Sequence, residues 1–411
     1  MDVQTQYTER EKRINDAISM KEPDRVPIAP KMGMYYGQVY NVSFYDVMMD
    51  TRNIIPAVES FLKDFQPDAV WSPFVYSLPA LEALGTNFIH WPGPTHKLPL
   101  DSHFQILDGC YLHDNEFAEF AKDPTHFIMT KALPRKHDNL KGLAKLDFRN
   151  AIEFGQFTCF VPFTDPEVKT AIDAMTKCGE AMLRWLQNAA EIAQFITDKG
   201  FPLGPSVAQT CAYDMFGDNY RGLLQTAMDV VERPDELEEI LDKMIDISVE
   251  CTIASAKASG APAVMIPLHG GVDEFMSPAN YRRFYWKGLN ALMTALSSNG
   301  ILPYIFCEGN YNSRLENLAE FTGEKAVFMF EKVDMKKVKD ILGKKFCICG
   351  NVPAALLAFG KPEQVTEEVK KLLDICAPGG GFIMDTSIEI TSAQPCNVEA
   401  FFEATYKYGK Y

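Results

Sequence analysis

The sequence predicts an α/β protein, a (β/α)8 TIM barrel with an elaborated segment between its second and third strands. Eight short apolar runs, each followed by a helical pattern, can be traced along the 411 residues. Alternating strands and helices favour a parallel sheet, and eight of them favour closure into a barrel. An open doubly wound sheet is the structural alternative, but it would need a G-x-G-x-x-G turn, which the sequence lacks.

The predicted strands share an apolar core and bounding turn residues, and lie at 26–32, 68–74, 202–211, 261–270, 301–309, 325–332, 345–352 and 380–387. Helical patterns for the outer ring lie at 233–258, 275–297, 311–321, 334–341, 362–376 and 395–408. Ser277 followed by Pro278 is a start signal for the second of these helices. We therefore expect one barrel domain over residues 1–411.

The segment 77–199 departs from simple alternation. Its first part is rich in Pro, Gly, His and aromatic residues and predicts irregular strands over one end of the barrel. Its second part opens with a capping-box arrangement at residues 164–167 and predicts a long amphipathic helix. One face of this helix carries apolar residues that we expect to pack in the core, namely Ala171, Met175, Cys178, Met182, Trp185, Ala189 and Phe195.

Composition excludes several classes of function. A formal net charge of -15 disfavours binding to a nucleic-acid backbone. No apolar run reaches the ~18 residues of a membrane span, and the charged N-terminus is unlike a signal peptide, so we expect a cytoplasmic protein. Ten cysteines at scattered spacings indicate reduced thiols, each a packing residue, a metal ligand or a nucleophile.

Polar residues stand at the ends of four successive predicted strands, where a parallel barrel brings them to one mouth. They are His269, Cys307 with Glu308, Glu331, and Cys349. His, Cys and Glu are zinc ligands, so the pattern predicts a metal at this mouth. The alternative is an ordinary polar pocket in which the cysteines pack as small apolar residues.

Other polar residues follow the same strands. Asp273 comes after two glycines and is a candidate acid or base, although helix N-terminal electrostatics also explains it. Arg314 is a candidate anchor for a carboxylate or phosphate group, with a salt bridge to Glu316 or Glu308 as the alternative. Asp214, in the segment after the third strand, is likewise a candidate acid or base, with helix N-terminal electrostatics as the alternative.

Several catalytic motifs are missing from the sequence. There is no Walker A loop, G-x-S-x-G elbow, H-E-x-x-H or EF-hand loop. Six of the seven histidines precede residue 140, and only His269 falls in the later half of the barrel. A catalytic triad that depends on histidine is therefore not expected.

The chain nevertheless resembles the uroporphyrinogen decarboxylase superfamily. The resemblance is carried by RINDAISMKEPDRVPIAPKM, HGGVDEFMSPANYRRFYWKGLNAL, FCEGNYNSRLE, GNVPAALLAFGKPEQVTEEVKKLLD, GGGFIMDTS and NVEAFFEATYKYG. One branch of that superfamily decarboxylates tetrapyrroles without a metal and carries an arginine-rich M-R-Q-A-G-R segment. The matching place here reads KMGMYYGQ, without arginine, so the resemblance to this branch does not extend to its substrate-neutralising groups.

The other branch contains zinc methyltransferases that work with a corrinoid protein. Their zinc is held by an H-x-C motif and a later cysteine, and Cys307 matches the motif cysteine while Ile305 stands in place of the histidine. Glu331 resembles the ligating glutamate of the related cobalamin-independent methionine synthase, whereas the late cysteine is replaced around Asp385 and Ser387. The resemblance implies zinc on part of this set only.

His269 and Cys349 are the possible substitutes, so the predicted metal set is His269, Cys307, Glu331 and Cys349. Within the resemblance we expect a methyltransferase of anaerobic metabolism that moves a methyl group between a small compound, such as an O-methyl aromatic, and a corrinoid. Asp273 or Glu308 would supply the proton to the leaving oxygen. The chain has no D-x-H-x-x-G segment, so the corrinoid would come on a separate protein.

Two alternatives stay open. The first is a metal-free lyase on a carboxylated substrate, with Arg314 as its anchor. The second is a non-catalytic protein that binds a corrinoid or a tetrapyrrole. The methyl donor, the direction of transfer and the oligomeric state do not follow from the sequence.

Overall fold

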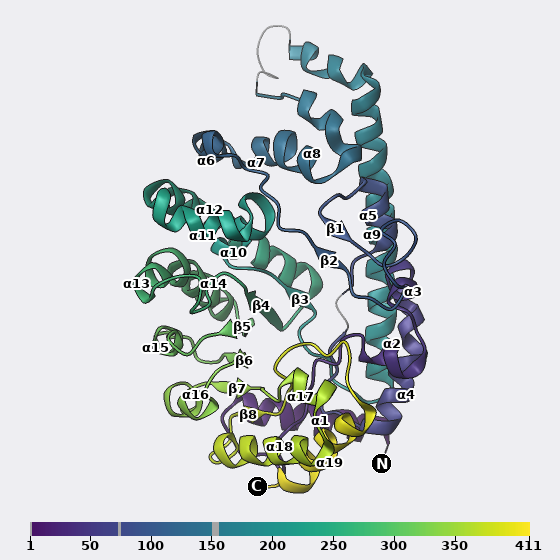
Figure 1. The fold of residues 1–411 in the computed structure, drawn as a ribbon, viewed down its shortest axis with the longest axis vertical. Coiled ribbons are helices and arrows are strands. Elements are labelled where there is room, and N and C mark those ends of the chain that lie inside the picture. The colour runs from purple at the N-terminus through teal and green to yellow at the C-terminus, as the bar shows by residue number, and fades with distance from the viewer. Residues whose placement is uncertain (1, 73–74, 150–155) are drawn as a thin grey trace.

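The computed structural model describes residues 2–72, 75–149 and 156–411. At its centre lies a six-stranded parallel sheet in the order β3-β4-β5-β6-β7-β8 (Figure 1). The strands are β3 (Val207–Ala208), β4 (Ala263–Leu268), β5 (Leu302–Asn310), β6 (Val327–Lys332), β7 (Cys347–Cys349) and β8 (Phe382–Ile383). The parallel α/β fold predicted from the sequence is therefore confirmed. Each of the six strands coincides with a predicted run, and β5 extends one residue beyond its run, to Asn310.

The first two predicted strands form isolated bridges instead. Ile28 bridges Met384 and Val70 bridges Leu203, both in parallel, and the amide of Asp68 donates to the carbonyl of Ile28 over 2.8 Å. These contacts link the β8 edge of the sheet to its β3 edge. The early runs contain prolines, which have no N–H to donate, and this limits them to short pairings. A closed barrel of eight regular strands stays a prediction.

Side chains alternate between the two faces of the sheet. On one face, which we call the inner face, Tyr304 and Phe306 of β5 pack with Met329 and Cys349 of the next two strands. The opposite, outer face packs against the surrounding helices and includes Cys307. This alternation decides which residue at each strand end can reach a ligand.

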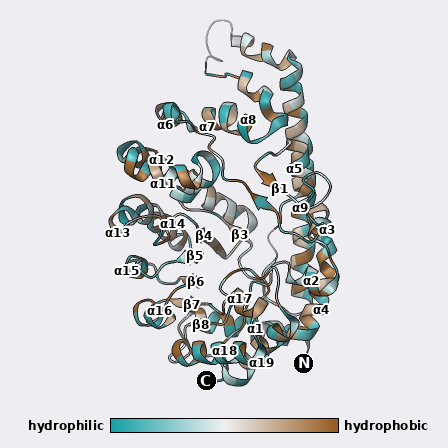
Figure 2. Ribbon diagram, viewed as in Figure 1, coloured by the Kyte–Doolittle hydropathy of each residue, from teal (hydrophilic) through white to brown (hydrophobic). Residues whose placement is uncertain are grey.

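The outer helices lie at their predicted positions, apart from an additional short helix at 354–359 that was not predicted. They are α12 (Pro234–Ser259), α13 (Pro278–Asn280), η7 (Tyr281–Trp286), α14 (Lys287–Ser298), α15 (Leu315–Ala319), α16 (Met335–Ile341), α17 (Ala354–Phe359), α18 (Pro362–Cys376) and α19 (Pro395–Tyr408). Ser277 caps the second group as predicted, since its hydroxyl accepts from the amide of Asn280 over 3.2 Å. Hydrophilic and hydrophobic residues alternate along these helices, as expected of helices with one face in the core (Figure 2).

Further helices precede the sheet and interrupt it. They are α1 (Val3–Ile18), α2 (Tyr35–Tyr40), α3 (Phe44–Met49), η1 (Thr51–Ile54), α4 (Ile55–Phe65) and α5 (Leu78–Leu84), with α10 (Ala212–Phe216), η6 (Gly217–Arg221) and α11 (Leu223–Glu232) after β3. No helix of the described residues is long and apolar enough to cross a membrane.

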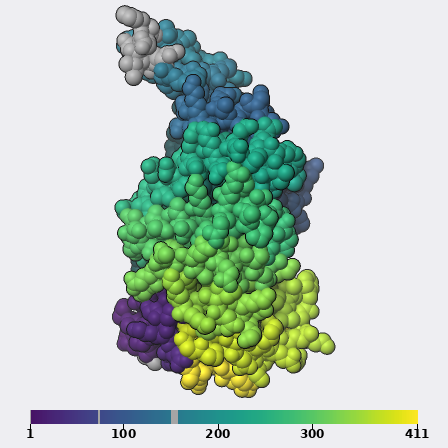
Figure 3. All heavy atoms as spheres, turned by 90° about the vertical axis from the view of Figure 1, so that its left-hand side faces the viewer, coloured from purple at the N-terminus to yellow at the C-terminus, as the bar shows by residue number. Residues whose placement is uncertain are grey.

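The segment 77–199 is mostly helical. The predicted irregular strands reduce to one antiparallel pair, β1 (Ile89–His90) with β2 (Gln105–Ile106). The helices that follow are η2 (Asp114–Glu116), α6 (Phe117–Lys122), α7 (Pro124–Phe127), η3 (Ile128–Ala132), α8 (Leu133–Lys136), η4 (Asp138–Lys145) and η5 (Gln156–Thr164). The part that leads into α9, including η5, projects beyond the rest of the molecule (Figure 3).

The long helix is α9 (Pro166–Asp198), and Asp165 caps it by accepting from the amide of Glu167 over 2.8 Å. The expected core stripe along it is only partly right. Ala171 is buried against η4, but Met175 and Met182 are exposed. Both lie on the side of the helix next to the buried one, and both stay open to solvent.

Candidate functional site

A cavity of about 930 Å³ opens beside the C-terminal ends of β3, β4 and β5. Its walls are mostly apolar and combine inner-face residues such as Met265 and Phe306 with Phe104 and Leu107 near β2 and Leu224 of α11. Aromatic rings at several points suit a flat, largely apolar small molecule. The predicted mouth of the sheet is thus where the cavity lies.

His269 follows β4 and contributes the most polar feature of this cavity. Its Nδ1 lies 2.8 Å from a carboxylate oxygen of Asp218, and its Nε2 lies 3.6 Å from Glu308. Burial opposes the charge on this ring, but the contacts with the two carboxylates outweigh it and raise the pKa of His269 to about 11. His269 is therefore an imidazolium at neutral pH.

Asp214 holds the backbone behind this histidine. It is fully buried and accepts from the amides of His269 at 3.1 Å and Gly270 at 2.7 Å, and from the hydroxyl of Tyr285 at 2.5 Å. Burial raises the pKa of Asp214 to about 6, and the nearby charge of His269 acts in the opposite direction. A Cβ on Gly270 would lie 2.4 Å from the Tyr213 ring, so glycine is required for this close approach.

Lys31 and Asp385 form a buried ion pair in the wall of the cavity. Asp385 also accepts from the amide of Lys31 at 3.0 Å, and its carboxylate lies 3.6 Å from the Cys349 sulfur. The Lys31 ammonium stands 4.9 Å from the centre of the Phe306 ring. Because its charge is already balanced, Lys31 is a weak anchor for a further anion.

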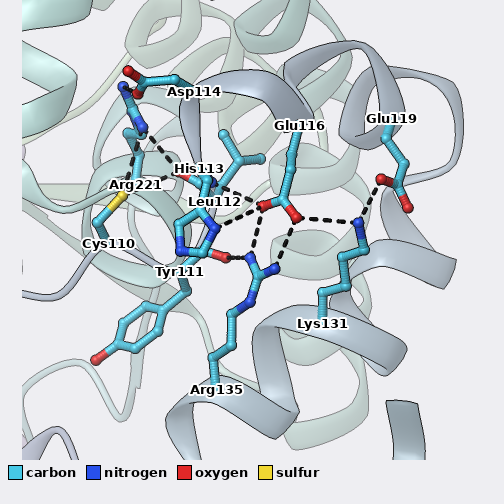
Figure 4. Close-up of polar contacts among 10 residues, drawn as sticks. All are labelled: Cys110, Tyr111, Leu112, His113, Asp114, Glu116, Glu119, Lys131, Arg135 and Arg221. Atoms are coloured by element: carbon cyan, nitrogen blue, oxygen red, sulfur yellow. Dashed lines mark hydrogen bonds and ion pairs between the residues drawn. The ribbon is translucent and has the colours of Figure 1, made fainter. Parts of the chain in front are cut away.

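A network of ion pairs fixes the element that carries Asp218 (Figure 4). Arg221, three residues after Asp218 at the end of η6, pairs with Asp229 at 2.6 Å and Asp114 at 2.7 Å. In the same view, Glu116 accepts from Arg135 through both carboxylate oxygens, at 2.7 Å each. The segment before α9 is thus tied to η6, which positions Asp218 beside His269.

The predicted metal ligands do not come together. In residues 2–72, 75–149 and 156–411, no group of three or more His, Cys, Asp or Glu side chains is arranged to hold a metal ion. His269 engages Asp218 and Glu308, whereas Glu331 accepts from the amide of Gly309 at 2.6 Å. Cys349 lies against Asp385. The residues present do not fit the zinc that the resemblance implied.

Cys307 departs most clearly from its predicted role. Since side chains alternate along β5, Phe306 and Glu308 face the cavity and Cys307 points to the outer face, where it is fully buried among apolar residues. Burial raises the pKa of its thiol well above the usual value, which disfavours the thiolate that binds metals. Cys307 is therefore a packing residue.

The other two predicted catalytic residues are also structural. Arg314 is fully buried and donates to the carbonyls of Gly271, Val272 and Met276 at 3.0, 3.1 and 2.5 Å. Asp273 accepts from the amide and hydroxyl of Ser313 at 3.0 and 2.7 Å and does not line the cavity. Together they fix the loop after β4, so neither is placed to act on a ligand.

Glu308 is the predicted catalytic residue that does line the cavity. Asp218 and Lys31 also line the cavity. Neither was predicted, because Asp218 lies in a helical segment and Lys31 lies within the first predicted strand, which carries no chemical motif. Polar residues at the end of the third predicted strand indicated the segment around Asp214. Asp218 lies four residues further along that segment. Together, His269, Asp218 and Glu308 can hold and transfer a proton at the Nε2 of His269.

Comparisons with known proteins agree with this architecture. Residues 171–408 match the family model described as uroporphyrinogen decarboxylase (URO-D). Uroporphyrinogen decarboxylase from Syntrophotalea carbinolica is 25% identical over 252 residues, covering 58% of this chain and 70% of that protein. The same enzyme from Aromatoleum aromaticum is 30% identical over 183 residues, which cover 43% of this chain and 49% of the relative.

Among solved structures, a methyltransferase from Methanosarcina mazei superposes with a TM-score of 0.63 at 16% identity, covering 97% of this chain and 98% of that one. At this identity the likeness concerns the fold. The family match, by contrast, covers more than half of the chain and includes all strands of the sheet that carry the site. The chain belongs to the uroporphyrinogen decarboxylase (URO-D) family.

Proposed function

We propose that the chain is a methyltransferase that moves a methyl group between an O-methyl aromatic compound bound in the cavity and a corrinoid carried by a separate protein. Family membership and the shared fold of a methyltransferase support an enzyme of this kind. The observation that carries the proposal is the position of His269 between the carboxylates of Asp218 and Glu308 in an otherwise largely apolar, aromatic-lined cavity.

The proton chemistry suits a phenolic leaving group. In demethylation the methyl–oxygen bond breaks, its electron pair stays on the oxygen, and that oxygen needs a proton. A phenol has a pKa of about 10, as in tyrosine, so it is well matched to His269 at about 11. Asp218 holds the Nδ1 of His269. The Nε2 of His269 makes the longer contact, with Glu308, and can turn to the substrate.

The corrinoid, when its protein is docked, supplies the nucleophile for the methyl group. This chain's own part is to bind the aromatic ring, exclude water and deliver the proton. Zinc has no role in this scheme, because the predicted ligands face in different directions.

Turnover tests the proposal directly. Purified protein is incubated under reducing conditions with 2-methoxyphenol and cob(I)alamin, and methylcobalamin is followed by absorbance while catechol is measured by chromatography. We expect the two products in equal amounts, and a rate lowered about 100-fold or more in His269→Gln. Asp273→Asn is the matched control on the same loop and should keep most of the rate. Equal rates in His269→Gln and the wild type would contradict the assigned role.

Decarboxylation of a porphyrinogen is the competing function, favoured by the names of the curated relatives. The cavity argues against it, since the acidic side chains among its described lining residues, namely Asp108, Asp218, Glu308 and Glu389, outnumber the cations Lys31 and His269. A substrate with many carboxylates would meet repulsion there. Release of carbon dioxide from uroporphyrinogen, without methyl transfer from any methoxyarene, would establish this alternative.

A further inference from the structure

A lysine without an ion pair is buried behind the wall of the cavity. Lys136, the last residue of α8, is 8% exposed. Its ammonium donates to the carbonyl of Asn219 at 3.3 Å, and within the described part of the chain it pairs with no carboxylate. Buried lysines are nearly always paired. An unpaired one therefore needs an explanation other than packing.

Two aromatic rings lie beside this ammonium. It stands 4.3 Å from the centre of the Phe88 ring and 5.3 Å from the centre of the Tyr111 ring. Such cation–π contacts offset part of the cost of burial. Phe88 and Asn219 line the cavity, whereas Lys136 stands behind them. The lysine therefore does not touch a ligand, but its charge acts on the groups in the wall.

One of these groups is the carboxylate of Asp218, which attracts the ammonium of Lys136. Asp218 precedes Asn219 on η6 and is the partner of His269 at 2.8 Å, while Glu308 lies 3.6 Å from the same ring. The two carboxylates and one imidazolium leave one negative charge, which Lys136 balances. Because a buried net charge is costly, Lys136 completes a neutral set.

We propose that Lys136 is a positioning residue of the proton transfer, and that its positive charge makes His269 a stronger acid by opposing the hold of Asp218 on the imidazolium proton. When His269 gives up its proton, two carboxylates remain beside a neutral ring. A cation behind Asp218 stabilises that state and disfavours the imidazolium before it. The inference rests on the proposed function, in which His269 protonates the leaving oxygen.

The charge of Lys136 is lost at only mildly alkaline pH. Burial lowers the pKa of Lys136 to about 8, while the attraction of Asp218 acts in the opposite direction. His269 keeps its own proton to a much higher pH. The loss of the lysine charge therefore alters a histidine that is still protonated.

The other titratable groups around Lys136 do not change charge in this range. Burial lowers the pKa of His137, the next residue in the chain, to about 4. Burial also raises the pKa of Tyr111 above its ordinary value of 10. Arg135, on the other side in the chain, is bonded to Glu116 at 2.7 Å. A change in the site near pH 8 can thus be assigned to Lys136.

The pH dependence of methyl transfer tests this role. Lys136→Met keeps an unbranched side chain and removes its charge. We expect its rate at neutral pH to be lowered about tenfold, with KM changed less than about twofold, because Lys136 does not touch the substrate. The wild type should lose the same factor as the pH rises through about 8. The two rates should therefore converge at higher pH, and Lys136→Met should show no step.

Two control variants separate Lys136 from its surroundings. Lys141→Met removes an exposed lysine of η4 that pairs with Asp138, and should keep both the rate and the step. Thiols titrate in a similar range, so Cys110→Ser, at an exposed position, should also keep the step. Wild-type and Lys136→Met rates that stay tenfold apart at every pH would overturn the proposal.

A measurement without turnover separates this inference from the proposed function. NMR of ¹³C-labelled histidine should show a change in the His269 resonance with a midpoint near pH 8 in the wild type and no such change in Lys136→Met. If no methoxyarene is demethylated, the proposed function fails, and this change still supports the coupling of Lys136 to His269. A wild type without the change overturns the coupling, whatever its turnover.

Urea denaturation shows whether Lys136→Met acts through the fold. The folded pKa of about 8 lies below the ordinary 10.5, so the charged lysine destabilises the fold below about pH 8, and stability rises between these two values. Lys136→Met should therefore unfold at a higher urea concentration than the wild type at neutral pH. A variant that gains stability and loses rate is not explained by damage to the fold. A lower urea midpoint together with rates that do not converge would identify Lys136 as a structural residue.

Discussion

His269 stands between Asp218 and Glu308, and its charge governs how the cavity handles a proton. Two carboxylates beside one imidazole over-compensate the cost of burial, so the ring keeps its proton far above neutral pH. Such a group is a poor general base and a suitable acid for a leaving oxygen that becomes basic only as its bond to carbon breaks. The function of this residue is therefore tied to its two neighbours rather than to the histidine alone.

Removing one neighbour should change the titration of His269. We expect Asp218→Asn to lower the pKa of His269 from about 11 toward its ordinary value of 6.5, with loss of activity above that pH. Because the folded pKa lies above 6.5, this charge stabilises the fold fully below that pH, and the contribution is lost as the pH rises through about 11. NMR of ¹³C-labelled histidine, assigned with His269→Gln, measures the midpoint. A wild-type midpoint below 7 would contradict the ion-pair assignment.

Arg314 leads to a prediction about stability instead of binding. Replacing it by Met leaves three buried carbonyls without their donor and removes the cation beside Asp273, and should lower the free energy of unfolding by ~3–5 kcal/mol. Urea denaturation measures this loss. Arg282→Met removes a comparable but exposed pair with Glu320 and should cost no more than about 1 kcal/mol. An Arg314→Met protein of unchanged stability that no longer binds substrate would restore the anchor role.

Residue types at strand ends predicted the place of the site and some of its members. His269 and Glu308 reach the cavity because both lie on the inner face, whereas Cys307, one position away, lies on the outer face. A shift of one residue in the register of a strand moves each side chain to the other face of the sheet. The residues around Cys307 are apolar on both faces, so the sequence does not show which of them face the cavity. Asp218 could not be predicted because its position depends on the helical segment after β3.

At the scale of elements, apolar runs and helix start signals located all six strands and most of the outer helices. They overestimated the first two strands, which form only isolated bridges, and they placed the exposed face of α9 in the core. Helical periodicity shows that a face is apolar, but it does not show whether the chain itself covers that face. The tertiary placement of η4 settled which side of α9 is buried.

The ion-pair network of Figure 4 makes η6 depend on the segment before α9. Arg135 lowers the pKa of Glu116 to about 2, so the contribution of Glu116 to stability is present above about pH 4.5 and is lost as the pH falls toward 2. We expect Glu116→Gln to speed hydrogen exchange in residues 110–136 at neutral pH and to weaken the acid dependence of that exchange. Asp147→Asn, which removes an exposed pair with Arg149, is the control and should leave exchange there unchanged. Equal protection in Glu116→Gln and wild type would show that the network does not hold the segment.

At the scale of the whole molecule, the net negative charge of the chain disfavours the binding of polyanions. The chain has a formal net charge of -15, and acidic side chains also outnumber basic ones in the lining of the cavity. From the lining of the cavity we infer that it suits uncharged aromatic ligands better than polycarboxylates. The difference lies in the side chains around the cavity and not in the arrangement of strands and helices.

Ligand binding tests this preference. Isothermal titration with 1,2-dimethoxybenzene and 3,4-dimethoxybenzoate compares two ligands that differ by one carboxylate, and we expect the neutral ligand to bind at least about tenfold more tightly, which corresponds to ~1.4 kcal/mol. Glu389 is one of the carboxylates in the wall of the cavity. Glu389→Gln should therefore tighten the binding of 3,4-dimethoxybenzoate alone and reduce the difference in affinity between the two ligands. Glu316→Gln, on α15 and outside the cavity, is a charge-matched control. Tighter binding of the benzoate by the wild type would show that Lys31 or His269 is available to an anion, and would favour the carboxylated substrate of a lyase.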